Sequence, residues 1–229
     1  AQIMENIDRV TRHIRKKNED GVCLHFHHTK DGSNYVLMGD SECWRVMNYV
    51  DSVTYNSSDD LNVVRYTGEA FGRFQTQLSD FDAAQLYETI PDFHNTKKRL
   101  AQLFADAEKD PVGRVDSVRG ELDYIKSVED IATRLTDMYA LGAFPPRVTH
   151  NDTKSNNVLF DRRTKKPLVV IDLDTVMPGM AMYDFGDAVR FAANTAEEDE
   201  PDTDKVGLDL DKFKAFEPFQ FTKNFIKIS

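Results

Sequence analysis

Cysteine, long apolar runs and clustered positive charge are all scarce in this sequence. Cys23 and Cys43 are the only cysteines and have no metal-like spacing, so we expect a reducing compartment. The chain has no apolar run near the roughly 20 residues that span a bilayer. Its formal net charge of −10 argues against a nucleic-acid surface, which requires clustered Lys and Arg. We therefore predict a cytoplasmic protein without membrane or nucleic-acid partners.

The first 50 residues combine one helical pattern with several strand-like runs. Ile3, Ile7, Val10 and Ile14 recur at helical spacing and predict an amphipathic helix over residues 2–17. Turn residues then separate three strand-like runs, which predicts an antiparallel meander. These runs are Gly21–Thr29, Asn34–Gly39 and Cys43–Val50.

After a polar linker at residues 56–60, the chain is mainly helical. Apolar stripes at helical spacing predict buried faces, and we also expect Trp44 in the core. The stripes comprise Phe71, Phe74 and Leu78, then Leu100, Leu103 and Phe104, then residues 125–141. A small sheet-containing part ahead of a larger helical part predicts an α+β fold with two lobes, residues 1–51 and 52–229.

The most informative segment begins at His150 and contains Asp152 and Asn157. An apolar strand follows and ends in Asp172. A His-x-Asp loop with Asn five residues after the Asp, followed by a strand that ends in Asp, is typical of kinase-type phosphoryl transfer. One carboxylate accepts the proton of the acceptor hydroxyl, and hard oxygen ligands hold the Mg²⁺ of the nucleotide.

These requirements assign a role to each polar residue of the segment. Asp152 is the candidate proton acceptor, and Asn157 and Asp172 are the candidate Mg²⁺ ligands. Lys154 places a positive charge near the transferred phosphoryl group. Asp174 is either an auxiliary metal ligand or a turn residue.

A literal Asp-Phe-Gly at residues 184–186 offers a competing metal carboxylate. It follows a Pro-Gly turn and reads as part of a helix, whereas Asp172 leaves a strand that pairs directly with the Asn157-bearing strand. We therefore predict that Asp172 is the metal ligand. Asp184 or Asp187 is expected to accept backbone N–H groups and hold the loop around Asp152 in shape.

Several stretches of this chain resemble the aminoglycoside phosphotransferase/choline kinase superfamily, whose fold is similar to that of protein kinases. The stretches are closest to bacterial N-acetylhexosamine 1-kinases. They run over residues 90–96, 148–154, 170–179 and 183–191. The resemblance implies a protein-kinase-like α+β fold, with an incomplete sheet in the N-terminal lobe.

The resemblance also implies an activity: transfer of the ATP γ-phosphate to the anomeric hydroxyl of N-acetylglucosamine or N-acetylgalactosamine. By the same resemblance, Asn48, Tyr49 and Val50 form the hinge that meets adenine, and Ile171 packs below the base. Phe191 lies against the sugar. Glu5 is either the acid that pairs with a phosphate-binding Lys or a first-turn acid favoured by the helix dipole.

Two parts of the family pattern are not found in the printed sequence. A Gly-rich loop and a strand-borne Lys should precede the helix at residue 2, and further helices should follow the C-terminal residues. Phe213, Phe216, Phe219, Phe221 and Phe225 are therefore expected to need a packing partner. Two alternatives remain open: a kinase of another small alcohol (an aminoglycoside, choline or a homoserine-like compound), or a catalytically inactive fragment.

Overall fold

The computed structural model of the chain describes residues 1–18, 21–39, 42–196 and 198–216. The chain forms two compact units. One unit comprises residues 1–89 together with those from 146 onward, and the other comprises residues 90–145. The sequence-based boundary at residue 51 stays a prediction.

The first helix agrees with its predicted range. Helix α1 spans Gln2–Lys17 and buries Met4, Ile7 and Val10, because these residues recur every three or four positions on one face. Basic residues occupy its last turn, where they complement the helix dipole.

The strands that follow are shorter than predicted. Strand β1 (Phe26–His27) pairs with β4 (Val46–Met47), and β2 (Val36–Met38) pairs with β3 (Glu42–Trp44), both antiparallel. The third predicted run is thus divided between two sheets at Arg45. Trp44 is 57% exposed, so the prediction that it belongs to the core is wrong. A two-stranded ribbon cannot bury both of its faces.

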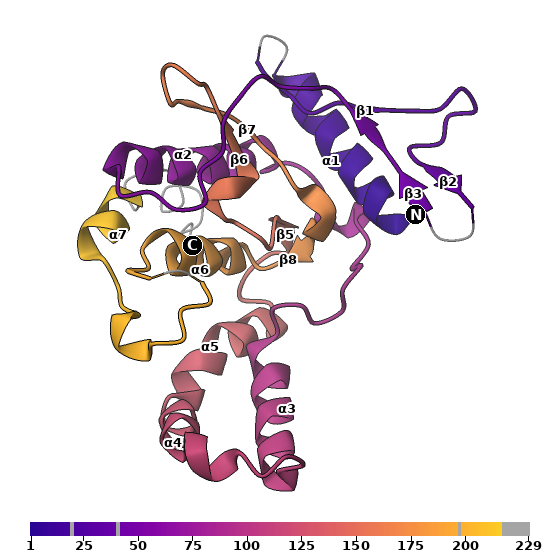
Figure 1. Cartoon of the computed structure of the whole chain (residues 1–229). Helices are drawn as coiled ribbons and strands as arrows, with labels where there is room; N and C mark the ends of the chain where they lie inside the picture. Colours follow the sequence, from indigo (N-terminus) through magenta and orange to yellow (C-terminus); the bar gives the residue numbers. More distant parts are fainter. Residues whose placement is uncertain (19–20, 40–41, 197, 217–229) are drawn as a thin grey trace. The chain divides into compact units, whose positions relative to one another are not determined.

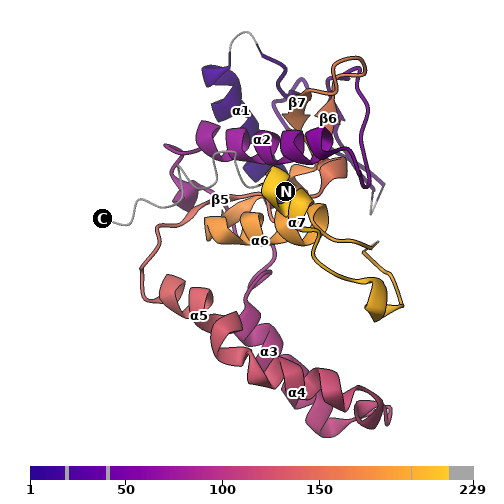
Figure 2. The same cartoon turned by 90° about the vertical axis from the view of Figure 1, so that its left-hand side faces the viewer.

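Helix α2 (Leu61–Gln77) begins after the polar linker at an N-cap, where the Asp60 side chain accepts a hydrogen bond from the Asn62 backbone N–H. Its stripe of Phe71 and Phe74, continued by Leu78, is buried as expected. Helix α7 (Leu210–Phe216) packs on α2 (Figure 2).

Phe216 is 1% exposed, so it already has the packing partner that the sequence analysis expected it to need. A Cβ at Gly68 would lie only 2.9 Å from the Phe216 backbone oxygen. Phe213 is partly buried. Phe219, Phe221 and Phe225 lie outside the described residues.

The remaining elements of this unit carry the candidate site. Strand β5 (Arg147–Thr149) pairs with β8 (Met177–Gly179), and β6 (Val158–Phe160) pairs with β7 (Pro167–Val170) in the predicted hairpin. Helix α6 (Ala181–Ala192) follows β8. Figure 1 shows the β6–β7 hairpin beside α2, in agreement with the contacts between α2 and β7.

The unit of residues 90–145 is helical. It contains α3 (Thr96–Lys109), α4 (Arg119–Ser127) and α5 (Glu129–Ala140), with α3 packed against α5. The apolar faces that were predicted to be buried are largely exposed in this unit. Helix α3 has no buried residue, and Ile131 and Leu141 are 78% and 86% exposed. A helical period shows which side chains share a face, but it does not show that the face is covered.

Short 3-10 helices complete the structure at Ala83–Gln85, Val115–Val118, Ser155–Asn157, Leu173–Thr175 and Thr203–Lys205. None of the helices in the described ranges has both the length and the apolar character needed to cross a membrane. The combination of helices with small antiparallel sheets confirms the predicted α+β class.

Candidate active site

The buried carboxylate of Asp184 organises the loop that follows β5. Its Oδ2 atom accepts the His150 backbone N–H at 2.9 Å, and its Oδ1 atom accepts the Asn151 backbone N–H at 2.9 Å. The Gln75 side chain donates to Oδ2 at 2.8 Å. Burial raises the pKa of Asp184, and these N–H donors oppose that rise.

Asp187, one turn further along α6, fixes the next part of the loop. Its Oδ2 atom accepts the Thr153 backbone N–H at 2.7 Å and the Thr153 hydroxyl at 3.0 Å. The predicted role of Asp184 or Asp187 as an acceptor of backbone N–H groups is therefore confirmed for both residues. Asn151 adopts a left-handed conformation with φ 67°, a strained conformation that these hydrogen bonds hold in place.

The His150 ring is fully buried and connects the two halves of the motif. Its Nε2 atom lies 2.9 Å from the Ile171 carbonyl oxygen, and its Nδ1 atom lies 3.3 Å from the Asp152 backbone nitrogen. A carbonyl can only accept and an N–H can only donate, so Nε2 carries the proton and Nδ1 accepts. The neutral ring thereby links the loop of Asp152 to the end of β7.

Asn157 directs its amide group at Asp152. Its Nδ2 atom donates to Asp152 Oδ2 at 2.8 Å and to the Asp152 backbone oxygen at 2.9 Å. Both partners are acceptors, so the group that faces them must be the NH₂ group rather than the carbonyl. The Asn157 side-chain oxygen therefore points away from Asp152 and has no partner among the described residues.

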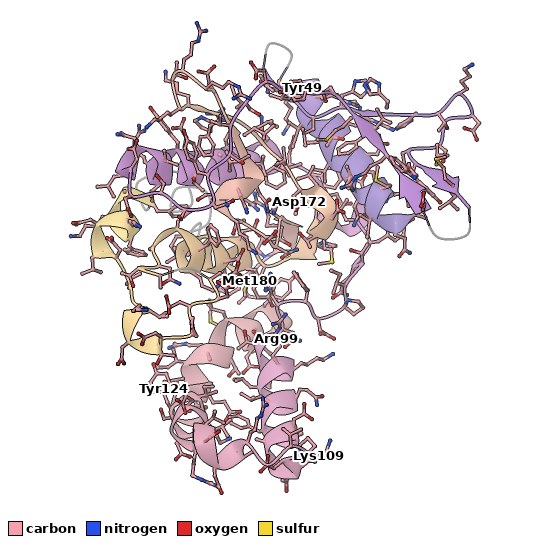
Figure 3. All side chains as sticks on the ribbon, viewed as in Figure 1. Tyr49, Arg99, Lys109, Tyr124, Asp172 and Met180 are labelled. Carbon is pink, nitrogen blue, oxygen red and sulfur yellow. The ribbon has the colours of Figure 1, made fainter. Side chains whose placement is uncertain are left out.

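Asp172 lies next to Asn157 through strand pairing. The Ile171 backbone N–H donates to the Asn157 carbonyl at 2.8 Å, at the end of the β6–β7 hairpin. Asp172 is exposed, has φ 58°, and marks the point where the chain turns beside α1 (Figure 3). No described residue bonds to its carboxylate. One carboxamide oxygen and one carboxylate are thus available, which fits Mg²⁺, a cation that prefers hard oxygen ligands and keeps several waters.

Asp174 has a partner within the protein. Its Oδ1 atom lies 2.5 Å from Arg45 Nη1, and Arg45 also lies over the Phe26 ring. This ion pair explains the position of Asp174 without a metal. Among the described residues, no three His, Cys, Asp or Glu side chains cluster closely enough to hold a metal ion.

Lys154 lies between two carboxylates. Its Nζ atom is 3.6 Å from Asp152 Oδ1 and 3.1 Å from Glu198 Oε2, and it lies 5.9 Å from the centre of the Phe191 ring. Arg190 contacts Glu198 at 3.3 Å. The structure therefore brings Asp152, Lys154 and Phe191 close together.

A pocket of about 480 Å³, partly open to solvent, lies next to this group of charges. Its lining includes Ser155, Arg190, Phe191, Asn194, Glu198 and Lys212. A second hollow of about 530 Å³ lies between α1, α2 and β7 and contains none of the candidate site residues.

The expected hinge residues follow β4. Asn48 is tied to the chain before β1, since its Oδ1 atom accepts the His25 N–H at 2.6 Å. Tyr49 is 82% exposed (Figure 3). Ile171 packs partly against the core. Glu5 pairs with Arg9 at 3.1 Å, and neither of its two predicted roles is decided by this contact.

Three residues at the site carry no local sequence signal: Gln75, Arg45 and Glu198. Gln75 and Arg45 lie more than 70 positions from their partners Asp184 and Asp174. Glu198 belongs to a run of acidic residues at 197–200, where nothing local sets it apart from its neighbours.

Comparison with known proteins gives a family match that covers most of the chain. A family model described as "Phosphotransferase enzyme family" (APH) matches residues 4–216. Among solved structures, the chain is similar to the streptomycin–ATP–APH(2'')-IIa ternary complex, with 16% identity and a TM-score of 0.43 over 81% of this chain. It is also similar to ADP-bound aminoglycoside phosphotransferase APH(2'')-Ib, with 15% identity and a TM-score of 0.42 over 96% of this chain. The chain spans 60% of the first structure's length and 68% of the second.

Proposed function

The chain belongs to the phosphotransferase enzyme family, and on that premise we propose that the intact protein is an ATP-dependent kinase of a small alcohol. The acceptor that we propose is the anomeric hydroxyl of an N-acetylhexosamine, either N-acetylglucosamine or N-acetylgalactosamine. Membership of this family confirms the predicted protein-kinase-like fold class.

The observation that carries the proposal is the bonding of Asn157 to Asp152. It leaves Asp152 Oδ1 as the oxygen that is free to receive a proton, because Oδ2 already accepts from Asn157. In the proposed reaction the acceptor oxygen bonds to the γ-phosphorus and the bond from phosphorus to the ADP oxygen breaks. The hydroxyl proton passes to Asp152 Oδ1.

Asn157 and Asp172 would hold Mg²⁺, since their oxygens have no other partner in the described part of the chain. A bound Mg²⁺ would neutralise negative charge on the phosphates. Lys154 adds a positive charge on the Asp152 side of the site. Asn48, Tyr49 and Val50 would bind adenine through their backbone, with Ile171 packed against the base.

The choice of a sugar is supported by the pocket beside Phe191. Its charged lining residues Arg190, Glu198 and Lys212 are all paired within the protein. Asn and Ser side chains, small apolar side chains and one aromatic ring line the rest. A polar but internally neutralised pocket with an aromatic face suits a neutral, hydroxyl-rich ligand better than a strongly charged one.

The test is ADP release by the intact protein with MgATP and a panel of acceptors. The panel contains both N-acetylhexosamines, an aminoglycoside, choline and homoserine. Activity with an N-acetylhexosamine supports the proposal, and activity with another acceptor alone keeps the kinase class but changes the substrate. No activity with any acceptor, in a preparation that binds ATP, would favour the inactive alternative.

A further inference from the structure

Glu198 lies at the centre of a chain of ion pairs that leads from α6 to the Asp152 side of the site. Its carboxylate contacts Lys154 at 3.1 Å and Arg190 at 3.3 Å. Arg190 is also bonded to Asp187 at 3.0 Å. Because Asp187 holds the backbone N–H of Thr153, the far end of the chain is fixed to the same loop that carries Asp152.

The distances show which carboxylate holds Lys154. The ammonium is within hydrogen-bond range of Glu198 but lies 3.6 Å from Asp152 Oδ1, beyond a normal N–H···O bond. The hydrogen bond to Lys154 lowers the pKa of Glu198, and the bond to Glu198 raises the pKa of Lys154. Both side chains are therefore charged near neutral pH, and the pair is attractive.

Without Glu198, Lys154 would have only one carboxylate within reach in the described part of the chain. The ammonium would then move to within hydrogen-bond range of Asp152 Oδ1. That oxygen is the one left open by Asn157, so a lysine bound to it would occupy the position of the acceptor hydroxyl.

We propose that Glu198 is a positioning residue that draws Lys154 away from Asp152 and so keeps Asp152 Oδ1 accessible to the acceptor. This inference rests on the proposed phosphotransferase function. Glu198 acts through Lys154 and need not touch the substrate. Arg190, on α6, contacts Glu198 from the other side and helps to fix the position of the Lys154 ammonium.

The first test compares Glu198→Gln with Asp199→Asn, which removes the same charge from the adjacent residue. Asp199 is exposed and makes no contact with Lys154. We expect Glu198→Gln to lower kcat about fivefold, because the variant loses the charge-assisted hydrogen bond to Lys154. The KM for ATP should change less than about twofold. Asp199→Asn should retain wild-type kinetics. Equal losses in both variants would show a general effect of charge and would overturn the proposal.

The second test is a double-mutant cycle with Lys154→Met. If Glu198 acts through Lys154, then Glu198→Gln causes no further loss of kcat in the Lys154→Met background. A fivefold loss in that background would mean that Glu198 acts by another route, and the proposal would fail.

A third measurement does not depend on catalysis. In protein labelled with ¹³C-glutamate, the side-chain carboxyl signal of Glu198 should titrate below the usual range for glutamate in the wild type. Its midpoint should rise in Lys154→Met, which removes the ammonium that contacts it. Among the described residues, Lys154 and Arg190 are the cations that contact Glu198. Lys154 also lies near Asp152, and Arg190 also contacts Asp187.

An unchanged Glu198 midpoint in Lys154→Met would refute the pairing whether or not the protein is a kinase. A wild-type protein that releases no ADP with any acceptor would instead refute the proposed function. The two failures are therefore distinguishable.

Discussion

Asn157 bonds to Asp152 twice through one nitrogen, at 2.8 Å to the side-chain Oδ2 atom and at 2.9 Å to the backbone oxygen. This relationship fixes the rotation of both side chains. The Asn157 oxygen is directed away from Asp152, and Asp152 Oδ1 is left open. A metal ligand and a proton acceptor can thus be neighbours without competing for the same atoms.

Replacement of the proton acceptor is the most direct test of this arrangement. We expect Asp152→Asn to lower kcat by about 10²- to 10⁴-fold, the usual contribution of a positioned general base, with little change in the KM for ATP. The measurement is steady-state ADP release, with Asp199→Asn as a control of equal charge. A kcat within twofold of the wild type would contradict the role of Asp152.

The two carboxylates after β7 should differ in their effect on magnesium. Asp172 has no partner among the described residues, whereas Asp174 is bonded to Arg45 at 2.5 Å. The measurement is the Mg²⁺ concentration at which binding of a fluorescent ATP analogue is half-maximal. We expect Asp172→Asn to raise this concentration at least tenfold, which corresponds to a loss of about 1.4 kcal/mol of Mg²⁺ binding free energy. Asp174→Asn and Arg45→Gln should each change it less than threefold. A larger effect of Asp174→Asn would identify Asp174 as an auxiliary ligand instead of a turn residue.

Asp184 should contribute to stability as well as to the shape of the loop. In Asp184→Asn the new NH₂ group would face N–H donors that now bond to a carboxylate oxygen. The loss of these buried hydrogen bonds should reduce the free energy of unfolding by about 3 kcal/mol, as measured by urea denaturation. Asp130→Asn, at an exposed position of α5, should change it by less than about 0.5 kcal/mol.

Gly68 and Gly186 provide a matched pair of helical glycines in the same unit. A Cβ at Gly68 would lie 2.9 Å from the Phe216 backbone oxygen and 3.2 Å from its ring, whereas a Cβ at Gly186 meets nothing within 4 Å. We expect Gly68→Ala to destabilise the protein by about 1–3 kcal/mol. Gly186→Ala should be neutral or stabilising by up to about 1 kcal/mol. Similar urea midpoints for the two variants would show that α7 does not pack closely on α2.

The contact between α1 and the end of α2 should depend on pH. Hydrogen bonds from Lys17 and then from His13 lower the pKa of Asp80 to about 2. A carboxyl group whose pKa is lowered on folding stabilises the folded state above its unfolded pKa and loses that effect as the pH falls through its folded value. Asp80→Asn should therefore lower Tm slightly at pH 5–7, and the difference from the wild type should shrink steadily between about pH 4 and pH 2. A difference at pH 2 as large as that at pH 5–7 would contradict this.

The sequence by itself determined the parts of the protein that depend on local spacing. The period of apolar residues predicted α1, and the order of His150, Asp152, Asn157 and Asp172 predicted the loop and the β6–β7 hairpin. The order of residues also predicted that Asp184 supports that loop. Asp172, and not Asp184, follows the strand that pairs with the Asn157-bearing strand.

Only the tertiary structure decided the contacts between distant side chains. The pairing of Arg45 with Asp174 joins positions 129 residues apart, and the position of Glu198 between Lys154 and Arg190 depends on where α6 places its last turn. The burial of Phe216 and the exposure of Trp44 and Ile131 likewise depend on which faces meet. A period along the chain specifies which residues share a face, but the free energy of burying that face comes from another element, which the local sequence does not identify.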